Sequence, residues 1–223
     1  MAKIKFGMFM TDARGKVGGQ VFSKNRGGAY VRTKVTPANG QTARQSYVRQ
    51  LLGAISQSWS GLTQSARDSF DGAVAQWSKT DIFGDIRNPT GKNLFTRLNI
   101  NLANSGQPEI LLAPEKLEMP FLTATAIEYG GLDMLVQSIV NTPGAVLVVS
   151  ATAPQSAGTN FFRGKYRQIG FYPGATANAA NLLPDYVSKF GTPASDANVS
   201  FELKWVLATG QTSTPLFVKM VEA

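Results

Sequence analysis

Two pairs of carboxylates lie close enough in the sequence to act together as a general acid and base. Asp81 and Asp85 fall in one loop, and Glu115 and Glu118 fall in a proline-rich stretch. Such a pair works when an apolar setting raises the pKa of one carboxyl group. Both pairs lie in polar or linker sequence, so we expect solvated acids rather than a catalytic pair.

Histidine and cysteine do not occur in the 223 residues. Their absence removes the usual base at neutral pH, the commonest metal ligand, thiolate nucleophiles and disulfides. Serine and threonine are plentiful, yet the sequence has no GxSxG elbow and no SxxK pair. We therefore expect a protein that is not an enzyme, with no cofactor, no metal and no small-molecule substrate.

Two glycine-rich stretches, GKVGGQVFSK and NPTGKNLF, suggest phosphate binding, but neither has the GxxxxGK[ST] spacing of a P-loop. Thr90, Gly91 and Lys92 open a predicted helix, and the N-terminus of a helix can hold an anion. A capped helix start explains the same three residues, and this is the interpretation that we favour.

Basic charge is concentrated at the N-terminal end of the chain. Residues 1–50 contain ten Lys and Arg and the single acid Asp12, a formal charge of +9. The other twelve Lys and Arg face thirteen acids, so the charge of +8 on the whole chain is an N-terminal property. An imbalance of this size predicts an acidic partner.

Residues 15–35, GKVGGQVFSKNRGGAYVRTKV, hold most of the candidate chemistry. Cations and aromatic residues that could bind a partner are Lys16, Phe22, Lys24, Arg26, Tyr30, Arg32 and Lys34. Aromatic residues among cations suit single-stranded nucleic acid. Lysines and glycines also occur on sheet edges, where they discourage unwanted pairing. A third interpretation, which we favour, is an arm that docks on an acidic protein neighbour.

The elements that position these residues begin with a β-hairpin over residues 16–35. Its turn is Asn25-Arg26-Gly27-Gly28, whose Asn and Gly residues tolerate positive φ. Two strands alone are only marginally stable in water. The hairpin must therefore lie on the rest of the molecule or on a neighbour.

Three helices are predicted in residues 41–107. The first has one apolar face and ends at Gly61, the second begins after the N-cap Thr63, and the third runs from about residue 92 to 104 and ends at Gly106. Because the first two are joined by a short link, we expect Trp59 and Trp77 to help fill one small core. The inward-facing positions of the first helix are Val48, Leu51, Leu52, Ile55 and Trp59.

Three prolines punctuate residues 108–120, and helical periodicity disappears beyond them. Six short β-rich runs separated by turn signals follow, which favours an antiparallel sandwich with a terminal hairpin that carries Trp205. No run of eighteen apolar residues and no apolar signal segment occurs, so we expect no membrane contact and synthesis in a cytoplasm.

The predicted fold class is therefore α+β. It consists of an N-terminal β-hairpin arm and a small helical domain, followed by a C-terminal antiparallel β-sandwich of immunoglobulin-like or fibronectin type III-like character. The predicted divisions are a basic arm at 1–40, helices at 41–107, a linker at 108–120 and the sandwich at 121–223.

The order of motifs resembles an uncharacterised family of virion structural proteins of tailed bacteriophages and prophages. The resemblance covers about the first 105 residues: the glycine-rich basic segment, a TPxNxxT turn, an RxxL…W helix, an LT…R helix and the stretch GKNLFTRLNINLANSG. Relatives more often have Asn-Pro where this chain has Asn39-Gly40, a difference that concerns the rigidity of the turn. The C-terminal part is similar to sandwich modules on pattern alone, and a shared fold does not fix a role.

The resemblance implies a non-enzymatic assembly component of the virion, made in the host bacterial cytoplasm and present in several copies. We expect it on the head, as a decoration or minor capsid protein, or on the neck or tail. The basic segment would bind the acidic surface of a neighbouring virion protein. The alternative is a DNA-binding accessory protein that uses the same hairpin.

Overall fold

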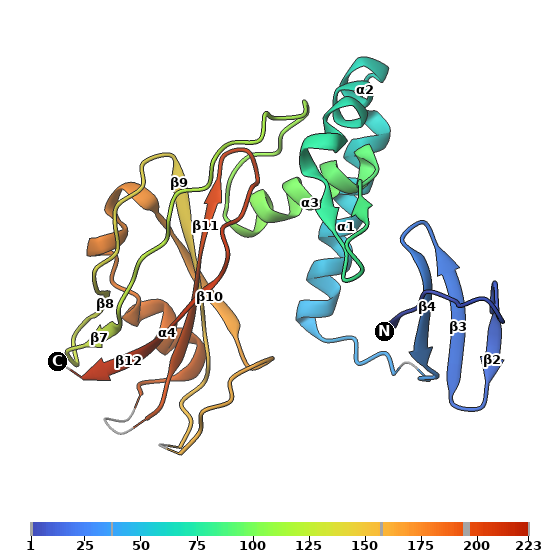
Figure 1. The fold of residues 1–223 in the computed structure, drawn as a ribbon. Coiled ribbons are helices and arrows are strands. Elements are labelled where there is room, and N and C mark those ends of the chain that lie inside the picture. The colour runs from blue at the N-terminus through green and yellow to red at the C-terminus, as the bar shows by residue number, and fades with distance from the viewer. Residues whose placement is uncertain (1, 37, 157, 194–196, 223) are drawn as a thin grey trace. The chain divides into compact units, whose positions relative to one another are not determined.

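The computed structural model describes residues 2–36, 38–156, 158–193 and 197–222 (Figure 1). Helices and strands are both present, so the predicted α+β class is confirmed. The chain forms two compact units. The first unit consists of Met1–Gln50 with Lys79–Arg87, and the second of Leu51–Ser78 with Asn88–Ala223.

A four-stranded antiparallel sheet makes up most of the first unit. Its strands are β1 (Ala2–Lys3), β2 (Gly15–Val17), β3 (Gln20–Asn25) and β4 (Gly28–Thr33), in the order β1-β4-β3-β2. The pair β3–β4 confirms the predicted hairpin, with Arg26 and Gly27 as its two-residue turn. The stretch expected as one strand before this turn is divided into β2 and β3, because Gly18 has a φ of +54° and turns the chain.

A second, smaller hairpin of the first unit comes from far along the chain. Its strands are β5 (Lys79–Thr80) and β6 (Ile86–Arg87). The Asp81 carboxylate closes the loop between them by accepting the backbone N–H groups of Phe83 (2.8 Å) and Asp85 (3.3 Å).

The predicted helices are confirmed as α1 (Ala43–Gly61), α2 (Gln64–Ala73) and α3 (Gly91–Asn104), with a 3-10 turn, η1 (Val74–Trp77), after α2. Thr63 caps α2 by accepting the N–H of Ala66 (3.3 Å), as its sequence position predicts. Gly106, two residues after the end of α3, has a φ of +70°, a conformation that glycine adopts without strain and that stops the helix from continuing.

These helices share a small core in the second unit. Its central feature is a set of three aromatic rings: Phe70 and Phe95 have centroids 5.2 Å apart, and Trp59 lies 5.3 Å from Phe95. Trp77 is buried in the same cluster and Trp59 is partly buried, so the predicted shared core is confirmed. The other buried members are Ile55, Leu94 and Leu98. Val48 and Leu52 were also predicted to face inward, which is wrong, because they are 46% and 48% exposed.

Each of the six predicted β-rich runs contains one strand of a six-stranded sheet in the order β10-β9-β11-β12-β7-β8. These strands are β7 (Ile127–Tyr129), β8 (Met134–Val136), β9 (Ala145–Ala151), β10 (Arg167–Pro173), β11 (Ser200–Leu207) and β12 (Leu216–Glu222). Trp205 lies fully buried on β11, and β11 and β12 form the predicted terminal hairpin.

The sheet is mixed, which corrects the prediction of a wholly antiparallel arrangement, because β12 and β7 run parallel. The Gln211 side chain, in the loop between β11 and β12, donates to the carbonyl of Leu117 and accepts its N–H, both at 2.8 Å. These two hydrogen bonds hold residue 117, in the segment that leads to β7, beside the loop that leads to β12. The strands β7 and β12 therefore both start from the same end of the sheet and run in the same direction.

Helical structure inside the C-terminal region was not predicted. A 3-10 segment, η2 (Gly174–Ala179), and a short helix, α4 (Leu183–Phe190), follow β10. Tyr186 of α4 is fully buried against Phe201, with ring centroids 5.9 Å apart, and its hydroxyl donates to the carbonyl of Thr152 (3.2 Å). The immunoglobulin-like or fibronectin type III-like sandwich stays a prediction.

Helix α3 and the large sheet belong to one compact unit, and side chains from both join them. Asn101 donates to the carbonyl of Gly210 (2.9 Å), and Gln168 of β10 donates to the carbonyl of Asn104 (2.7 Å). The division between the compact units therefore does not fall at the predicted linker, residues 108–120. Among the helices in the described part of the chain, none has the length and apolar character to cross a membrane.

Candidate functional site

The predicted partner-binding residues all lie on or beside the four-stranded sheet. Lys16 is on β2, Phe22 and Lys24 are on β3, and Tyr30 and Arg32 are on β4. Arg26 is in the β3–β4 turn, and Lys34 follows β4 with its N–H donated to the carbonyl of Gly19 (2.8 Å).

Strand register places part of this set in a row across one face. Lys16 lies opposite Val21, and Val21 lies opposite Arg32. Residues directly opposite one another in antiparallel strands point to the same face. We call Lys16, Val21 and Arg32 the cationic row. Tyr30 and Lys3, which are register partners, lie on the same face in the next row.

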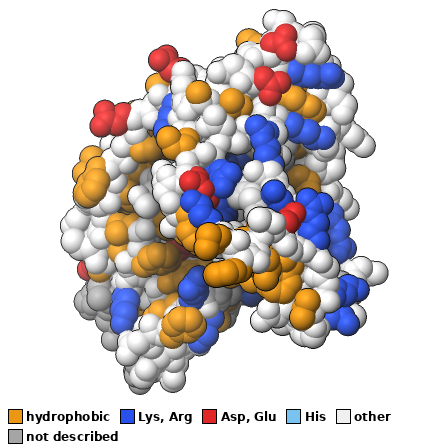
Figure 2. Space-filling view, turned by 45° about the vertical axis from the view of Figure 1, so that its right-hand side comes forward, with side chains coloured by type: hydrophobic (Ala, Val, Ile, Leu, Met, Phe, Trp, Pro, Cys, Tyr) orange, Lys and Arg blue, Asp and Glu red, His pale blue; other side chains and the backbone are white. Residues whose placement is uncertain are grey.

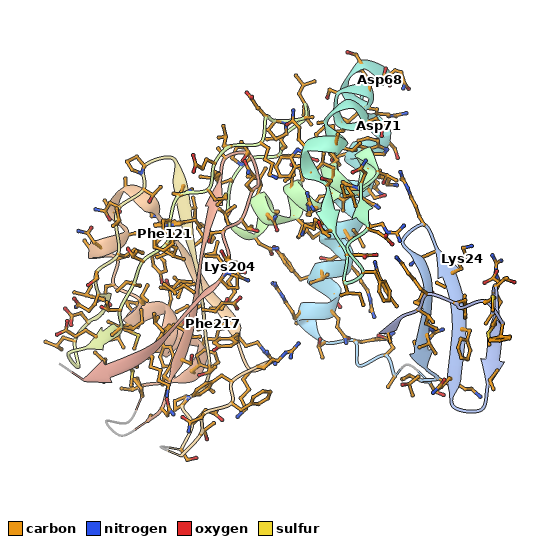
Figure 3. The ribbon with its side chains drawn as sticks, viewed as in Figure 1. Lys24, Asp68, Asp71, Phe121, Lys204 and Phe217 are labelled. Atoms are coloured by element: carbon orange, nitrogen blue, oxygen red, sulfur yellow. The ribbon has the colours of Figure 1, made fainter. Side chains whose placement is uncertain are left out.

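Phe22 and Lys24 point to the opposite face, because side chains alternate along a strand. Phe22 lies opposite Val31, and Lys24, labelled in Figure 3, lies opposite Ala29. The structure therefore divides the predicted residues between two faces. Lys16, Tyr30 and Arg32 are brought together, whereas Phe22 and Lys24 are placed on a more apolar face.

The first unit has no hydrophobic core of its own among its described residues. Every buried hydrophobic residue of the described chain belongs to the second unit, and the earliest of them is Ile55. In the sheet, Phe22, Tyr30 and Val31 are partly exposed and Val17 is 67% exposed. A sheet of this kind gains little from apolar burial within its own unit.

Two acids of the small hairpin hold the N-terminal strand. The Lys3 ammonium lies 2.9 Å from the Asp81 carboxylate, Lys5 lies 3.3 Å from Asp85, and the Arg87 guanidinium contacts both acids at 3.4 and 3.2 Å. We call these five residues the acidic clamp. It joins segments that are 78 and 80 residues apart in the chain.

The Asp81 side chain is only 5% exposed, so the expectation of two solvated loop acids is wrong for this residue. The hydrogen bond from Lys3 lowers the pKa of Asp81 well below its ordinary value. The backbone N–H groups of Phe83 and Asp85 and the Arg87 guanidinium act in the same direction, against the opposing effect of desolvation. Asp81 is therefore ionised at neutral pH, and its carboxylate holds the loop and the N-terminal strand in place.

Positive charge remains on the first unit after these pairs are formed. The unit contains twelve Lys and Arg against three acids, a net charge of +9, and the second unit has ten against eleven, a net charge of −1. Within the described residues, ion pairs in segment 1–50 involve only Lys3, Lys5 and Arg14. The other seven cations of that segment have no carboxylate in ion-pair distance there. Figure 2 shows blue Lys and Arg side chains outnumbering red acidic ones on one face of the molecule.

The possible anion site at the start of α3 is occupied by the chain itself. The carboxylate of Asp71, a residue of α2 that is labelled in Figure 3, accepts the N–H of Gly91 at 3.0 Å. Thr90 caps the same helix by accepting the N–H of Asn93 at 3.2 Å. The capped helix start is therefore confirmed, and the helix N-terminus already has its own carboxylate.

A groove of about 560 Å³ lies on the large sheet, beside Phe162, Tyr166 and Phe217. Polar side chains that line it already have partners: the Tyr166 and Ser200 hydroxyls are 2.9 Å apart, Lys219 donates to Asn160 (3.4 Å), and Glu202 pairs at 2.6 Å with Lys204, which lies outside the groove. In the part of the chain that the structure describes, no group of three or more acidic side chains is placed to hold a metal ion. The sheet of the first unit is therefore the candidate site.

Comparisons with protein-family models, curated proteins and solved structures find no match for this chain.

Proposed function

We propose that this protein is a non-enzymatic structural subunit of a tailed-bacteriophage virion. It attaches to the head, as a decoration or minor capsid protein, or to the neck or tail, through its basic N-terminal sheet. It is made in the host bacterial cytoplasm and enters the particle in several copies. The observation that carries this proposal is a sheet unit with a charge of +9 and no buried hydrophobic residue among its described residues.

The charge of the first unit supports attachment to an acidic surface. Seven cations of residues 1–50 have no carboxylate partner among the described residues, and two of them stand in the cationic row. Complementary charge guides association and excludes partners of like charge. A second copy of the same unit would be repelled, so the neighbour is a different, acidic protein surface.

The lack of a core in the first unit supports the same assignment. Partly exposed apolar side chains, among them Phe22, Val17 and Val31, lie on the face opposite the cationic row. An assembled particle can cover such a sheet and supply the apolar contacts that its own unit lacks. In this proposal the second unit is the displayed or packing module, because it contains the helical core and a second hydrophobic core around Trp205 and Tyr186 of the large sheet and α4. Its likeness to immunoglobulin-like or fibronectin type III-like sandwiches belongs to the same proposal.

A second candidate function is that of a DNA-binding accessory protein. The observation that favours it is the position of Tyr30 on the same face as Lys16 and Arg32. An aromatic ring among cations can stack on a base while the cations neutralise phosphates. Binding to duplex DNA would then weaken with salt by a slope of about −0.9 per neutralised phosphate in log K against log salt.

The experiment that tests the first proposal is to look for the protein in particles. Virions of the phage that encodes the chain are purified, treated with nuclease and quantified by mass spectrometry. We expect the protein at a fixed copy number per particle, unchanged by the nuclease. Abundant protein in infected cells with none in finished particles would overturn the proposal, and loss on nuclease treatment would favour the DNA-binding alternative.

A further inference from the structure

An exposed apolar turn lies between the first two strands of the N-terminal sheet. β1 and β2 are the opposite edges of the sheet, so residues 4–14 must carry the chain from one edge to the other (Figure 1). Midway, the N–H of Met10 is donated to the carbonyl of Gly7 (3.2 Å), which closes a turn. Met8 and Phe9 take the two central positions of this turn.

Both central side chains point into solvent. Met8 is 89% exposed and Phe9 is 97% exposed, and the following Met10 is 52% exposed. Scattered single apolar residues on a surface need no explanation, but two large ones together at the tip of a turn form a patch. Aromatic and methionine side chains are also those enriched at the centres of protein interfaces.

The N-terminal flank of the turn is tied to the rest of the first unit. On one side, Lys5 pairs with Asp85 (3.3 Å) and lies over the ring of Phe83 (5.3 Å to the centroid). On the other side, Arg14 pairs with Asp12 (3.5 Å), a contact that stays within the same flank. Exposed ion pairs add little to stability, but the Lys5–Asp85 pair narrows the positions that the turn can take. The tip is therefore presented before any partner binds.

We propose that the turn Gly7–Met10 is the apolar anchor by which the first unit docks on its acidic neighbour. Met8 and Phe9 enter an apolar pocket of that neighbour. Acidic side chains at the rim of the pocket face those cations of the first unit that have no carboxylate partner among the described residues. This inference rests on the proposed function, because it names the contact that the attachment uses.

Charge selects this occupant over two others. A second copy offers either a unit of +9, which repels, or a unit of −1, which attracts weakly. Duplex DNA would satisfy the cations, and an apolar wedge can enter a base step. The turn itself, however, is bounded by Lys5 and Arg14, whose charges are already neutralised by acids of the chain. An apolar tip with neutralised flanks fits a protein pocket better than a phosphate backbone.

The test uses the full-length chain in the infecting phage, with Phe9→Ser and Met8→Ser as variants. Phe121→Ser is the matched control, because Phe121 is 84% exposed and lies in the second unit (Figure 3). Each variant is produced together with the wild-type chain, and mass spectrometry compares the ratio of variant to wild type in particles and in the lysate. An interface anchor typically changes affinity about thirtyfold or more. We therefore expect Phe9→Ser to be depleted strongly, Met8→Ser to be depleted less, and Phe121→Ser to keep the lysate ratio.

Three results would overturn the anchor. The first is an unchanged particle ratio for Phe9→Ser while the wild type is present in particles. The second is a loss of binding to a short DNA duplex on Phe9→Ser, and the third is concentration-dependent self-association of the wild type that this variant abolishes. Absence of the wild type from particles would instead refute the proposed function itself. Circular dichroism melting confirms that each variant is folded.

Discussion

Neutralising the cationic row tests whether the partner contacts one face of the N-terminal sheet. The perturbation is the double variant Lys16→Gln/Arg32→Gln, which removes both charges of the row and leaves Val21 in place. The control is Lys24→Gln/Arg26→Gln, which removes two charges from the opposite face and from the turn. All four side chains are exposed, so neither variant should change the free energy of unfolding by more than about 0.5 kcal/mol.

The magnitude follows from the spacing of the strands. Lys16 and Arg32 are separated by one intervening strand, so their Cα atoms lie about 10 Å apart. That separation is close to one Debye length at physiological salt, and the two charges can face the same acidic patch. An exposed ion pair contributes about 0.2 to 1 kcal/mol. Losing two pairs therefore weakens binding by about 0.4 to 2 kcal/mol, a factor of about 2 to 30.

The assay is competition for places in the particle. Wild type and variant are expressed together during infection, and their ratio is measured in purified particles and in the lysate by mass spectrometry. The double variant of the row should be under-represented in particles by the factor above. The control should keep its ratio, because in this proposal the particle covers the opposite face through apolar contacts and not through its charges. Equal depletion of both variants would show that total charge matters and that the face does not. An unchanged ratio for the row variant would refute the assignment of that face.

Three further outcomes are expected for stability and folding. Gly91→Ala should lower the free energy of unfolding by about 1 to 3 kcal/mol, because the new Cβ would overlap the Asp71 carboxylate and lie 2.9 Å from the Asp71 backbone nitrogen. Gly72→Ala, at an open helical position, should raise the free energy of unfolding by about 0.5 to 1 kcal/mol. Calorimetric melting of the two variants and the wild type measures both changes. The pKa of Asp81 is lowered in the folded state, so the ionised Asp81 stabilises the fold fully above about pH 4, and this stabilisation is lost as the pH falls through the lowered pKa. The protection of the β1 and β4 amides against hydrogen exchange should fall over the same pH range. Asp81→Asn should not show this pH-dependent loss of protection. Deleting residues 1–36 should leave a soluble, cooperatively melting protein, because every buried hydrophobic residue of the described chain lies outside the deleted segment. The shortened protein should no longer enter particles. Gel filtration measures the first effect and particle content the second, and normal incorporation would contradict the hypothesis that residues 1–36 are an attachment arm.

Local sequence signals predicted most of the individual elements. The helices of residues 43–104 follow from apolar spacing and from the caps Thr63 and Thr90, all of which act within a few residues. The six strands of the large sheet follow from short β-rich runs between turns. Such signals say nothing of which strands become neighbours, so the parallel pairing of β12 with β7 could not be predicted.

The features of the candidate site that could not be predicted from the sequence depend on contacts between residues far apart in the chain. The acidic clamp joins Lys3 and Lys5 to acids about 80 residues away, and no periodicity or turn signal links those segments. The sequence could have predicted that Phe22 and Lys24 lie on the opposite face of the sheet from Tyr30 and Arg32. A two-residue turn sets the register of a hairpin and thereby the face of each side chain. Helix α4 is short and lies among strand-like runs, which is why its residues gave no helical expectation.

The first unit is assembled from two separate stretches of the chain, and this has a mechanical consequence. The backbone passes between the two units three times, after Gln50, after Ser78 and after Arg87. A pulling force on a particle-bound sheet would be shared among these three covalent links. For the same reason, a grafting experiment that transfers only residues 1–50 to a foreign protein would leave behind the hairpin that fastens the first strand, so a transferable version of this attachment must include residues 79–87.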